Sequence, residues 1–452
     1  MRLRGVFATA LLATAASGCW VQAGFGPGRT AHNDLESTVT AANVAGLEPA
    51  WTASVGGLAQ EPIISGGTTY VRSEGALTAL NLGTGAQKWQ TTTFGDGHSL
   101  DGHSLDGWGV PAVVAGKLRV PASSAATPAT NGVPCSLVTI DPSDGGVDGV
   151  TAVGPDHFDP GPLSSWSCGT DDALTAGSKV VVPWDDSFSD TSPIPTCREF
   201  ASRSAGVAAI DVEAASNTWF RSDFTWSQCS GDGDPPPPPP FFSPSQASVS
   251  GDQLIEVHGE AQGAVLTAYR LADCGKGTGS SCVVSWTLDL GAYVVGPPVV
   301  LANGDIAVAL ENTRIAIVDG ASHTVEWTSG PSNAGIVQPL AATPTTIFAA
   351  YADGTVAAFP AAGCGASLCG WTWISALGST ASARPSIGGD VLYVGSHGGT
   401  LTALPAEGCG SPTCAPLWTH ETGSTITGAP AIFNGTIVVG SLDGTVTAFR
   451  LP

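Results

Sequence analysis

One hairpin pattern recurs three times in the last hundred residues of the chain. Its turns begin at Asp353, Gly398 and Asp443, so successive copies lie 45 residues apart. Each turn carries a glycine, which accepts the positive φ of a tight hairpin, between two β-rich runs. A short strand precedes each hairpin, and a strand led by tryptophan follows the first two. A four-stranded unit repeated at this period predicts a β-propeller.

Weaker copies of the unit extend back towards the N-terminus. They lie at residues 69–80, 118–140, 180–210, 254–269 and 306–317. With the three clear copies they make eight units. The last unit ends at the C-terminus without a tryptophan strand, whereas Trp51 stands alone before the first. We therefore predict an all-β fold, an eight-bladed β-propeller over residues 46–452 in which the N-terminal strand around Trp51 completes the last blade and removes open sheet edges.

Cysteine pairs mark the connection between the third and fourth strands in three units. We predict a local disulfide within each of the pairs Cys274 and Cys282, Cys364 and Cys369, and Cys409 and Cys414. The remaining cysteines of the propeller, which lie in long insertions, are Cys135, Cys168, Cys197 and Cys229. They allow three pairings, of which the geometry of adjacent blades favours Cys135–Cys197 with Cys168–Cys229. Five disulfides indicate an oxidising compartment.

The first 18 residues predict a secretory signal peptide. Arg2 and Arg4 precede an apolar run, and small residues stand directly before Cys19. The segment resembles a bacterial lipoprotein signal, which implies that Cys19 becomes a lipidated N-terminus; a plain secretory signal is the alternative. Residues 19–45 are then expected to be a tether. The predicted location is the cell envelope, outside the cytoplasm, with either membrane as the carrier of the anchor.

The charge of the chain excludes some partners. It has 16 Lys and Arg against 38 Asp and Glu, a formal net charge of −22. So acidic a protein is not expected to bind nucleic acid or to dock electrostatically on anionic lipid. No apolar run after residue 19 approaches the length of a membrane span. We expect a monomer attached to the membrane by its lipid anchor.

Units without the cysteine pair carry a different connection. Asn or Asp stands eight residues before the tryptophan in 81–89, 211–219 and 319–327. Residues 79–89 read Ala-Leu-Asn-Leu-Gly-Thr-Gly-Ala-Gln-Lys-Trp. This closely resembles the tryptophan-docking repeat of quinoprotein (PQQ-like) propellers, Ala-x-Asp-x-x-Thr-Gly-x-x-x-Trp, with Asn for Asp. The resemblance extends over nearly all of residues 45–452, and it implies tryptophans that pack between neighbouring blades as core residues.

Long insertions should crowd one face of blades one to four. They span 90–110, 121–135, 150–175, 184–206 and 222–247, and the last contains six prolines at 235–240 that predict a stiff spacer. A candidate ligand face lies in these insertions and consists of Trp108, Trp166, Trp184, Trp226, Asp171, Asp172, Asp185 and Asp186. Aromatic platforms beside acids suit a sugar, a cationic ligand or Ca²⁺. Alternatively, these tryptophans fill the loops and the acids cap turns.

The resemblance does not transfer an activity to particular residues. PQQ-dependent dehydrogenases of the family need an Asp base and a Glu and Asn around Ca²⁺, and many carry a disulfide between adjacent cysteines; no two cysteines are adjacent here. The duplicated segment 96–107, with two His, matches no metal-site spacing, and no nucleophile elbow is present. We predict no catalytic residue and no metal site.

These observations favour a non-catalytic, lipid-anchored scaffold that binds an envelope protein or glycan. One alternative is a PQQ- and Ca²⁺-dependent oxidoreductase with a divergent site that uses the four acids of the candidate ligand face. The other is a carbohydrate-binding lipoprotein that uses its four tryptophans as stacking platforms. A shared fold does not decide among the three.

Overall fold

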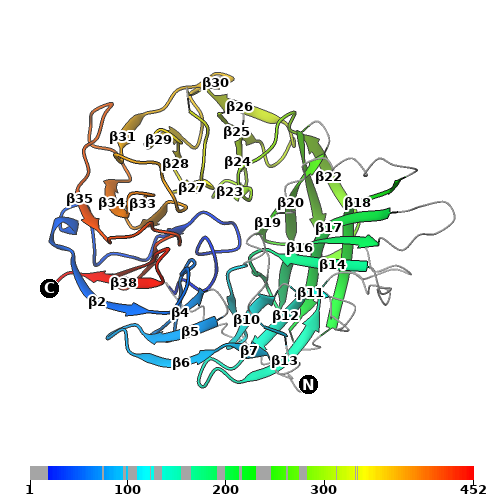
Figure 1. Ribbon diagram of the computed structural model, residues 1–452. Coiled ribbons are helices and arrows are strands. Elements are labelled where there is room, and N and C mark those ends of the chain that lie inside the picture. The colour runs from blue at the N-terminus through cyan, green and yellow to red at the C-terminus, as the bar shows by residue number, and fades with distance from the viewer. Residues whose placement is uncertain are drawn as a thin grey trace, which may run out of the picture.

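The computed structural model describes most of the chain after the predicted signal. The described residues are 19–73, 76–94, 98–99, 109–122, 124–126, 135–153, 164–190, 199–212, 216–230, 246–260, 263–273, 282–311, 313–330, 332 and 334–452. They form a ring of eight β-sheets, the blades, and in the first seven the four blade strands follow one another outward in chain order (Figure 1). The predicted all-β, eight-bladed propeller is confirmed.

The strands of the first four blades lie between residues 63 and 289. Blade 1 consists of β3 (Ile63–Ser65), β4 (Thr68–Ser73), β5 (Ala76–Asn81) and β6 (Gln87–Thr91). Blade 2 consists of β9 (Ala112–Val114), β10 (Lys117–Ala122), β12 (Ser136–Ile140) and β13 (Val147–Ala152). Blade 3 consists of β15 (Leu174–Ala176), β16 (Lys179–Asp190), β17 (Glu199–Asp211) and β18 (Ser216–Ser230). Blade 4 consists of β19 (Gln246–Ser250), β20 (Gln253–Glu260), β21 (Gly263–Arg270) and β22 (Val284–Asp289).

The last four blades are shorter and more regular. Blade 5 consists of β23 (Val299–Val300), β24 (Ile306–Leu310), β25 (Arg314–Val318) and β26 (Val325–Ser329). Blade 6 consists of β27 (Ala341–Ala342), β28 (Thr346–Ala350), β29 (Thr355–Pro360) and β31 (Trp373–Ala376). Blade 7 consists of β32 (Ser386–Gly388), β33 (Val391–Gly395), β34 (Thr400–Pro405) and β35 (Trp418–Glu421). Blade 8 consists of β36 (Ala431–Phe433), β37 (Thr436–Gly440), β38 (Thr445–Arg450) and β2 (Glu48–Ser54).

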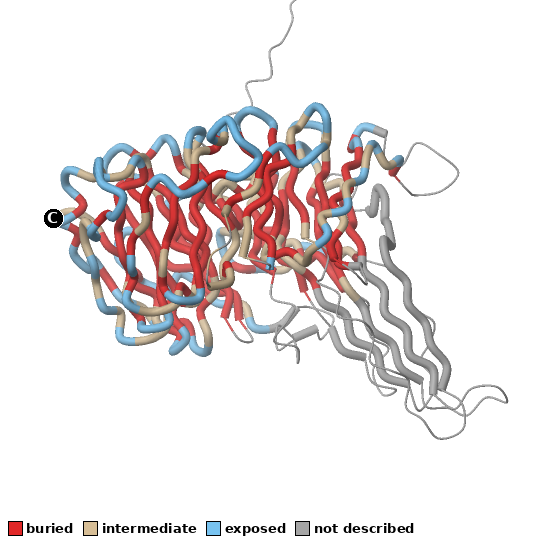
Figure 2. The backbone as a smooth tube through the Cα atoms, turned by 90° about the horizontal axis from the view of Figure 1, so that it is seen from above, coloured by how far each residue is buried: buried red, intermediate tan, exposed pale blue. Residues whose placement is uncertain are grey.

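Blade 8 closes the ring as the sequence predicted. β2, from the N-terminal part of the chain, pairs antiparallel with β38 at the C-terminus, and Trp51 lies opposite Ala448. The two ends of the propeller therefore share one sheet, so separating them requires breaking that ladder. Buried residues follow the strands, whereas exposed residues gather in the turns at both faces of the ring (Figure 2).

The blade tryptophans pack between neighbouring blades. The indole N–H of Trp51 donates to the carbonyl of Leu82 in blade 1 at 2.8 Å, and that of Trp89 donates to the carbonyl of Pro142 in blade 2 at 3.0 Å. A glycine of the next blade approaches each of these rings closely, Gly85 against Trp51 and Gly145 against Trp89. A Cβ atom on Gly85, whose φ is +72°, would stand 2.6 Å from Trp51. These tryptophans are structural, as expected from the resemblance.

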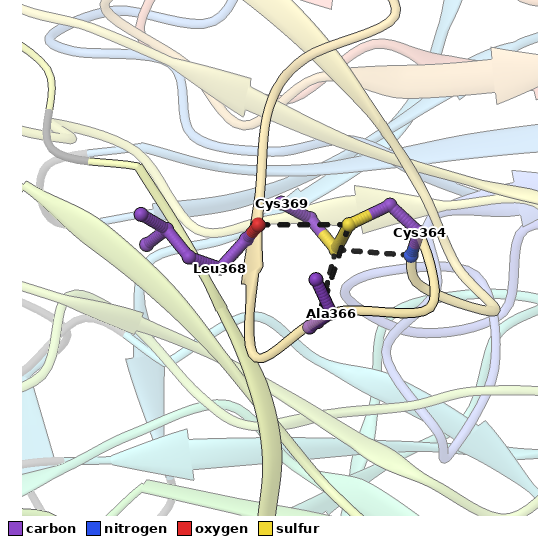
Figure 3. Close-up of a disulfide and its surroundings, with 4 residues drawn as sticks. All are labelled: Cys364, Ala366, Leu368 and Cys369. Atoms are coloured by element: carbon purple, nitrogen blue, oxygen red, sulfur yellow. Dashed lines mark hydrogen bonds between the residues drawn. A yellow bond between two sulfur atoms is a disulfide. The ribbon is translucent and has the colours of Figure 1, made fainter.

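The cysteine pairs of blades 6 and 7 form the predicted local disulfides, Cys364–Cys369 and Cys409–Cys414. Figure 3 shows the first, with the backbone N–H of Cys364 directed at Cys369 Sγ at 2.9 Å. The bonded loop reaches the preceding blade through β30 (Leu368–Cys369), which pairs parallel with β26. These disulfides therefore brace contacts between blades as well as single hairpins.

The other predicted disulfides are tested in part. Cys135 and Cys282 are both disulfide-bonded. Cys168 and Cys229 lie on β14 (Ser164–Thr170) and β18, whereas Cys197 and Cys274 lie outside the described residues. The pairing of these cysteines stays a prediction. Two insertions extend the sheet of blade 3, because β11 (Ser124–Ala126) pairs with β14, and β14 pairs with β16.

Candidate functional site

The centre of the ring is occupied by residues 20–33, which we call the inner segment. This part of the chain crosses the middle of the ring (Figure 1). Backbone N–H groups of the innermost strands donate to its carbonyls at 2.7–2.9 Å. These pairs are Ile64 to Trp20, Val113 to Val21, Val249 to Pro27, Val300 to Gly28, Ala342 to Thr30 and Ile387 to Ala31.

Side chains of the inner segment reach the two blades that these bonds omit. Gln22 Oε1 accepts the backbone N–H of Thr175 in blade 3 at 2.9 Å. The amide of Asn33 donates to the carbonyl of Ile432 in blade 8 at 2.9 Å. One short segment thus bonds to all eight blades. It satisfies backbone groups that would otherwise be unpaired along the inner edges of the sheets.

The inner segment corrects the expectation of a tether over residues 19–45. Trp20, Gln22, Arg29 and Ala31 are fully buried. Only its last two residues form a strand, β1 (His32–Asn33), which pairs parallel with β32; the rest bonds to one residue per blade, so the sequence contains no strand pattern there. Composition alone therefore made it look like a linker.

A buried network of opposite charges holds the inner segment against the blades. Arg384 Nη2 lies 3.0 Å from Glu61 Oε2 and 4.0 Å from Asp172 Oδ2, and Arg29 forms a close ion pair with the same Asp172 oxygen. Glu61 Oε1 also accepts the backbone N–H of Gly24 at 3.0 Å and the indole N–H of Trp20 at 3.3 Å. The network joins blades 1, 3 and 7 through the segment. Removing one member of such a network leaves a buried charge uncompensated.

Asp171 and Asp172 differ in protonation although they are adjacent. Burial, and then the charge of Asp172, raises the pKa of Asp171 to about 6. Burial alone would also raise the pKa of Asp172, but the charges of Arg29 and Arg384 outweigh it, so that pKa is lowered. Asp172 Oδ1 in addition accepts the backbone N–H of Val110 at 2.8 Å. Asp172 is thus an ionised structural acid, and Asp171 is the acid that gains a proton in mildly acidic solution.

The structure separates the members of the candidate ligand face. Trp184 is 1% exposed and packs in the core between blades 2 and 3, so its ring has no side open to a ligand. Asp171 and Asp172 lie at the centre of the ring, and Asp185 lies on β16. Three other members lie on strands of the blade 3 sheet: Trp166 on β14, Asp186 on β16 and Trp226 on β18. The structure describes their backbone but not their side chains, and it does not describe Trp108. The expectation of exposure is therefore corrected for Trp184 and untested for the other three tryptophans.

Sequence reasoning missed Arg29, Glu61 and Arg384. A signal was present for the last two, because each stands directly before a proline at the start of an innermost strand, Pro62 and Pro385. Glu61 and Arg384 occupy the same position in two repeats. Since the innermost strands surround the ring axis, opposite charges at that position indicate side chains that meet near the axis. For Arg29 there was no such signal, since its segment belongs to no repeat.

Asp172, one of the four acids considered for a quinone and Ca²⁺, already has partners within the protein. It forms an ion pair with the fully buried Arg29, lies 4.0 Å from Arg384 and accepts the backbone N–H of Val110. Within the described ranges, no three His, Cys, Asp or Glu side chains are grouped so that they could hold a metal ion. None of the helices in this part of the chain has the length and apolar character that crossing a membrane requires.

Comparisons with known proteins agree with this fold. The family model described as outer membrane protein assembly factor BamB matches residues 352–451. BamB from Moraxella catarrhalis superimposes with a TM-score of 0.54 at 14% identity, over 89% of this chain and 97% of that one. A europium-containing methanol dehydrogenase superimposes with a TM-score of 0.65 at 14% identity, over 96% and 98%.

A quinohemoprotein alcohol dehydrogenase from Pseudomonas putida HK5 superimposes with a TM-score of 0.64 at 14% identity, over 96% of this chain and 80% of that one. At such identities these structures share the fold, and nothing more follows from them. No curated protein matches the sequence significantly.

Proposed function

We propose that this PQQ-like β-propeller is a lipid-anchored scaffold outside the cytoplasm, which binds an envelope protein or glycan without catalysing a reaction. The observation that carries the proposal is the occupied centre of the ring. Trp20 and Arg29 of the inner segment are fully buried there, and the charges of Glu61 and Asp172 are paired with arginines. Asp172, one of the acids considered for a cofactor, thus helps to hold the inner segment in place.

The comparisons with known proteins are consistent with a scaffold, but they do not distinguish it from a dehydrogenase. The matching family model is named for an assembly factor, whereas two of the similar structures are named as dehydrogenases. A fold shared by both classes is compatible with either, so the residues at the centre carry the choice. For a quinone and Ca²⁺ to use Asp171 and Asp172, Arg29 would have to leave, and the inner segment would have to separate from the blades it bonds.

The test uses the mature chain, residues 19–452, with its disulfides intact. It is titrated with PQQ and Ca²⁺ while tryptophan fluorescence and alcohol-dependent dye reduction are recorded. We expect neither a saturable signal nor turnover, and the variant Asp172→Asn serves as the matched control. Micromolar saturation with turnover, both lost in Asp172→Asn, would make the protein a divergent dehydrogenase.

A second measurement addresses the anchor. The protein is isolated from cell membranes and the mass of its N-terminal peptide is determined, beside that of Cys19→Ser. We expect acyl groups on Cys19 and release of the serine variant into the soluble fraction. An unmodified Cys19 in a soluble protein would refute the lipid anchor and leave the scaffold role open.

A further inference from the structure

We infer that the membrane lies directly against one face of the propeller, without a spacer. We call this the anchor face; it is formed by the turns between first and second strands and by the connections between third and fourth strands. The inference rests on the proposed lipid anchor at Cys19. It specifies the face of the propeller that contacts the membrane, because a lipid anchor by itself does not determine that face.

The position of the inner segment determines where the anchor leaves the protein. The carbonyls of Gly28 and Thr30 accept the backbone N–H groups of Val300 and Ala342, the last residues of β23 and β27. The carbonyl of Asn33 accepts that of Gly389, in the turn that follows β32. The inner segment therefore lies at the anchor-face end of the ring. The Cα atom of Cys19 is one peptide unit, about 3.8 Å, from that of Trp20, so the acylated residue is held at that end.

In the described part of the chain, a buried layer lies between the inner segment and the opposite end of the ring. Glu61, which precedes β3, lies on that side of the inner segment and bonds Trp20, Gly24 and Arg384. Trp20 is fully buried, and the Glu61 and Arg384 side chains are 7% and 8% exposed. Chains that crossed this layer would break a buried ion pair. The lipid thus emerges through the anchor face.

The apolar side chains left in water are gathered on the same face. Among the described residues, six large hydrophobic side chains are exposed. Five lie on the anchor face: Leu35 beside the central turns, and Val283, Val325, Leu368 and Trp371 around the rim of blades 4 to 6. The sixth, Leu442, lies in a turn of the opposite face. Trp371 is 48% exposed, and tryptophan is favoured at the boundary between lipid and water.

The charge of this face limits the lipid that it suits. Asp319 and Glu326 stand near the apolar rim, and the whole chain is strongly acidic. Anionic headgroups would repel such a surface. The acyl chains and the apolar rim therefore supply the attraction, and a bilayer with zwitterionic headgroups is the expected partner.

Hydrogen exchange on the acylated full-length protein tests the inference, with and without phosphatidylcholine vesicles. We expect several-fold slower exchange on vesicles in the anchor-face segments 361–372, 388–391 and 406–417. The turns of the opposite face, 351–355, 396–400 and 441–445, should not change. A matched variant carries ten Gly and Ser residues inserted between Cys19 and Trp20. It should stay on the vesicles but lose the protection, because the insertion supplies the missing spacer.

Each outcome decides a separate claim. Protection of both faces or of the opposite face would overturn the orientation while leaving the anchor intact. Equal protection with the inserted spacer would overturn the claim that the short attachment at Cys19 holds the membrane against this face. An unmodified Cys19 in the purified protein would overturn the anchor and the orientation together. Mass determination of the N-terminal peptide before the exchange experiment distinguishes these cases.

Discussion

Substituting Gly85 with alanine should loosen the contact that closes the ring. Gly85 lies in blade 1 against Trp51 of blade 8, and its φ is +72°. An added Cβ atom would stand 2.6, 2.7 and 3.0 Å from three ring atoms of Trp51. Gly56 offers a matched control, because its φ is +73° and an added Cβ would meet nothing within 4 Å. The pair separates backbone strain from the clash with the tryptophan.

The expected loss of unfolding free energy in each variant is the sum of backbone strain and the clash with Trp51. An L-residue in the left-handed region costs about 1–2 kcal/mol, and both variants carry this cost. Only Gly85→Ala also overpacks a buried contact, which costs about 1–3 kcal/mol more. Trp51 is 8% exposed and donates to Leu82, so it has little room to move aside. Gly85→Ala should therefore lower the free energy of unfolding by about 1–3 kcal/mol more than Gly56→Ala does.

Urea denaturation of both variants measures the difference. Tryptophan fluorescence and far-ultraviolet circular dichroism are recorded together, since coincident transitions justify a single free energy of unfolding. In the Trp51→Leu background, Gly85→Ala should cost less than it does in the wild-type protein, because the smaller side chain removes the clash. Equal stability of Gly85→Ala and Gly56→Ala would refute the close packing of Trp51 on blade 1.

Three further predictions concern the inner segment and the braced loops. Glu61→Ala should cost about 3–5 kcal/mol, because it leaves the buried Arg384 with only the more distant Asp172, and hydrogen exchange should become faster in residues 20–33. Replacing Cys364 and Cys369 by serine removes a disulfide that closes a short loop, at a cost of about 2 kcal/mol in urea denaturation. The folded protein raises the pKa of Asp171 from 3.8 to about 6, so it binds this proton more tightly than the unfolded chain. The stabilisation is therefore full below pH 3.8 and is lost as the pH rises to about 6, by at most about 3 kcal/mol.

Each of these has its own control. Glu61→Ala is compared with Glu48→Ala, an exposed acid on β2; similar effects would argue against the buried network. For the disulfide, the loss should disappear when both proteins are measured in reductant. Asp171→Asn should flatten the pH dependence between pH 4 and 6, and an unchanged slope would show that another group is responsible.

The repeats made the fold predictable from the sequence. The fold was predicted from local features of the sequence. These are the turns at Asp353, Gly398 and Asp443, the tryptophans, and the cysteine pairs five residues apart. Closure by Trp51 also followed, because an array of eight units in which the last lacks its fourth strand, with one spare strand before the first, has few solutions. Each of these features is set by neighbours in sequence or by the repeat itself.

The candidate site was not predictable in the same way. Asp171 and Asp172 were recognised as unusual acids, but their partners Arg29 and Arg384 lie far away in the chain. Trp184 looked exposed in an insertion, whereas packing between blades 2 and 3 buries it. The same residue types in the same loops could have faced solvent, since nothing local fixes which blade edge they meet.

The sequence by itself thus determined the blades, their number and the strand that closes the ring, because β-turns, strand alternation and tryptophan docking act over tens of residues. Only the tertiary structure decided what fills the centre. Residues 20–33 carry no repeat and no strand pattern, yet they bond to the innermost strand of every blade. Their place depends on eight sheet edges that come together only when the ring has closed, and unpaired backbone groups at those edges select the segment that can satisfy them.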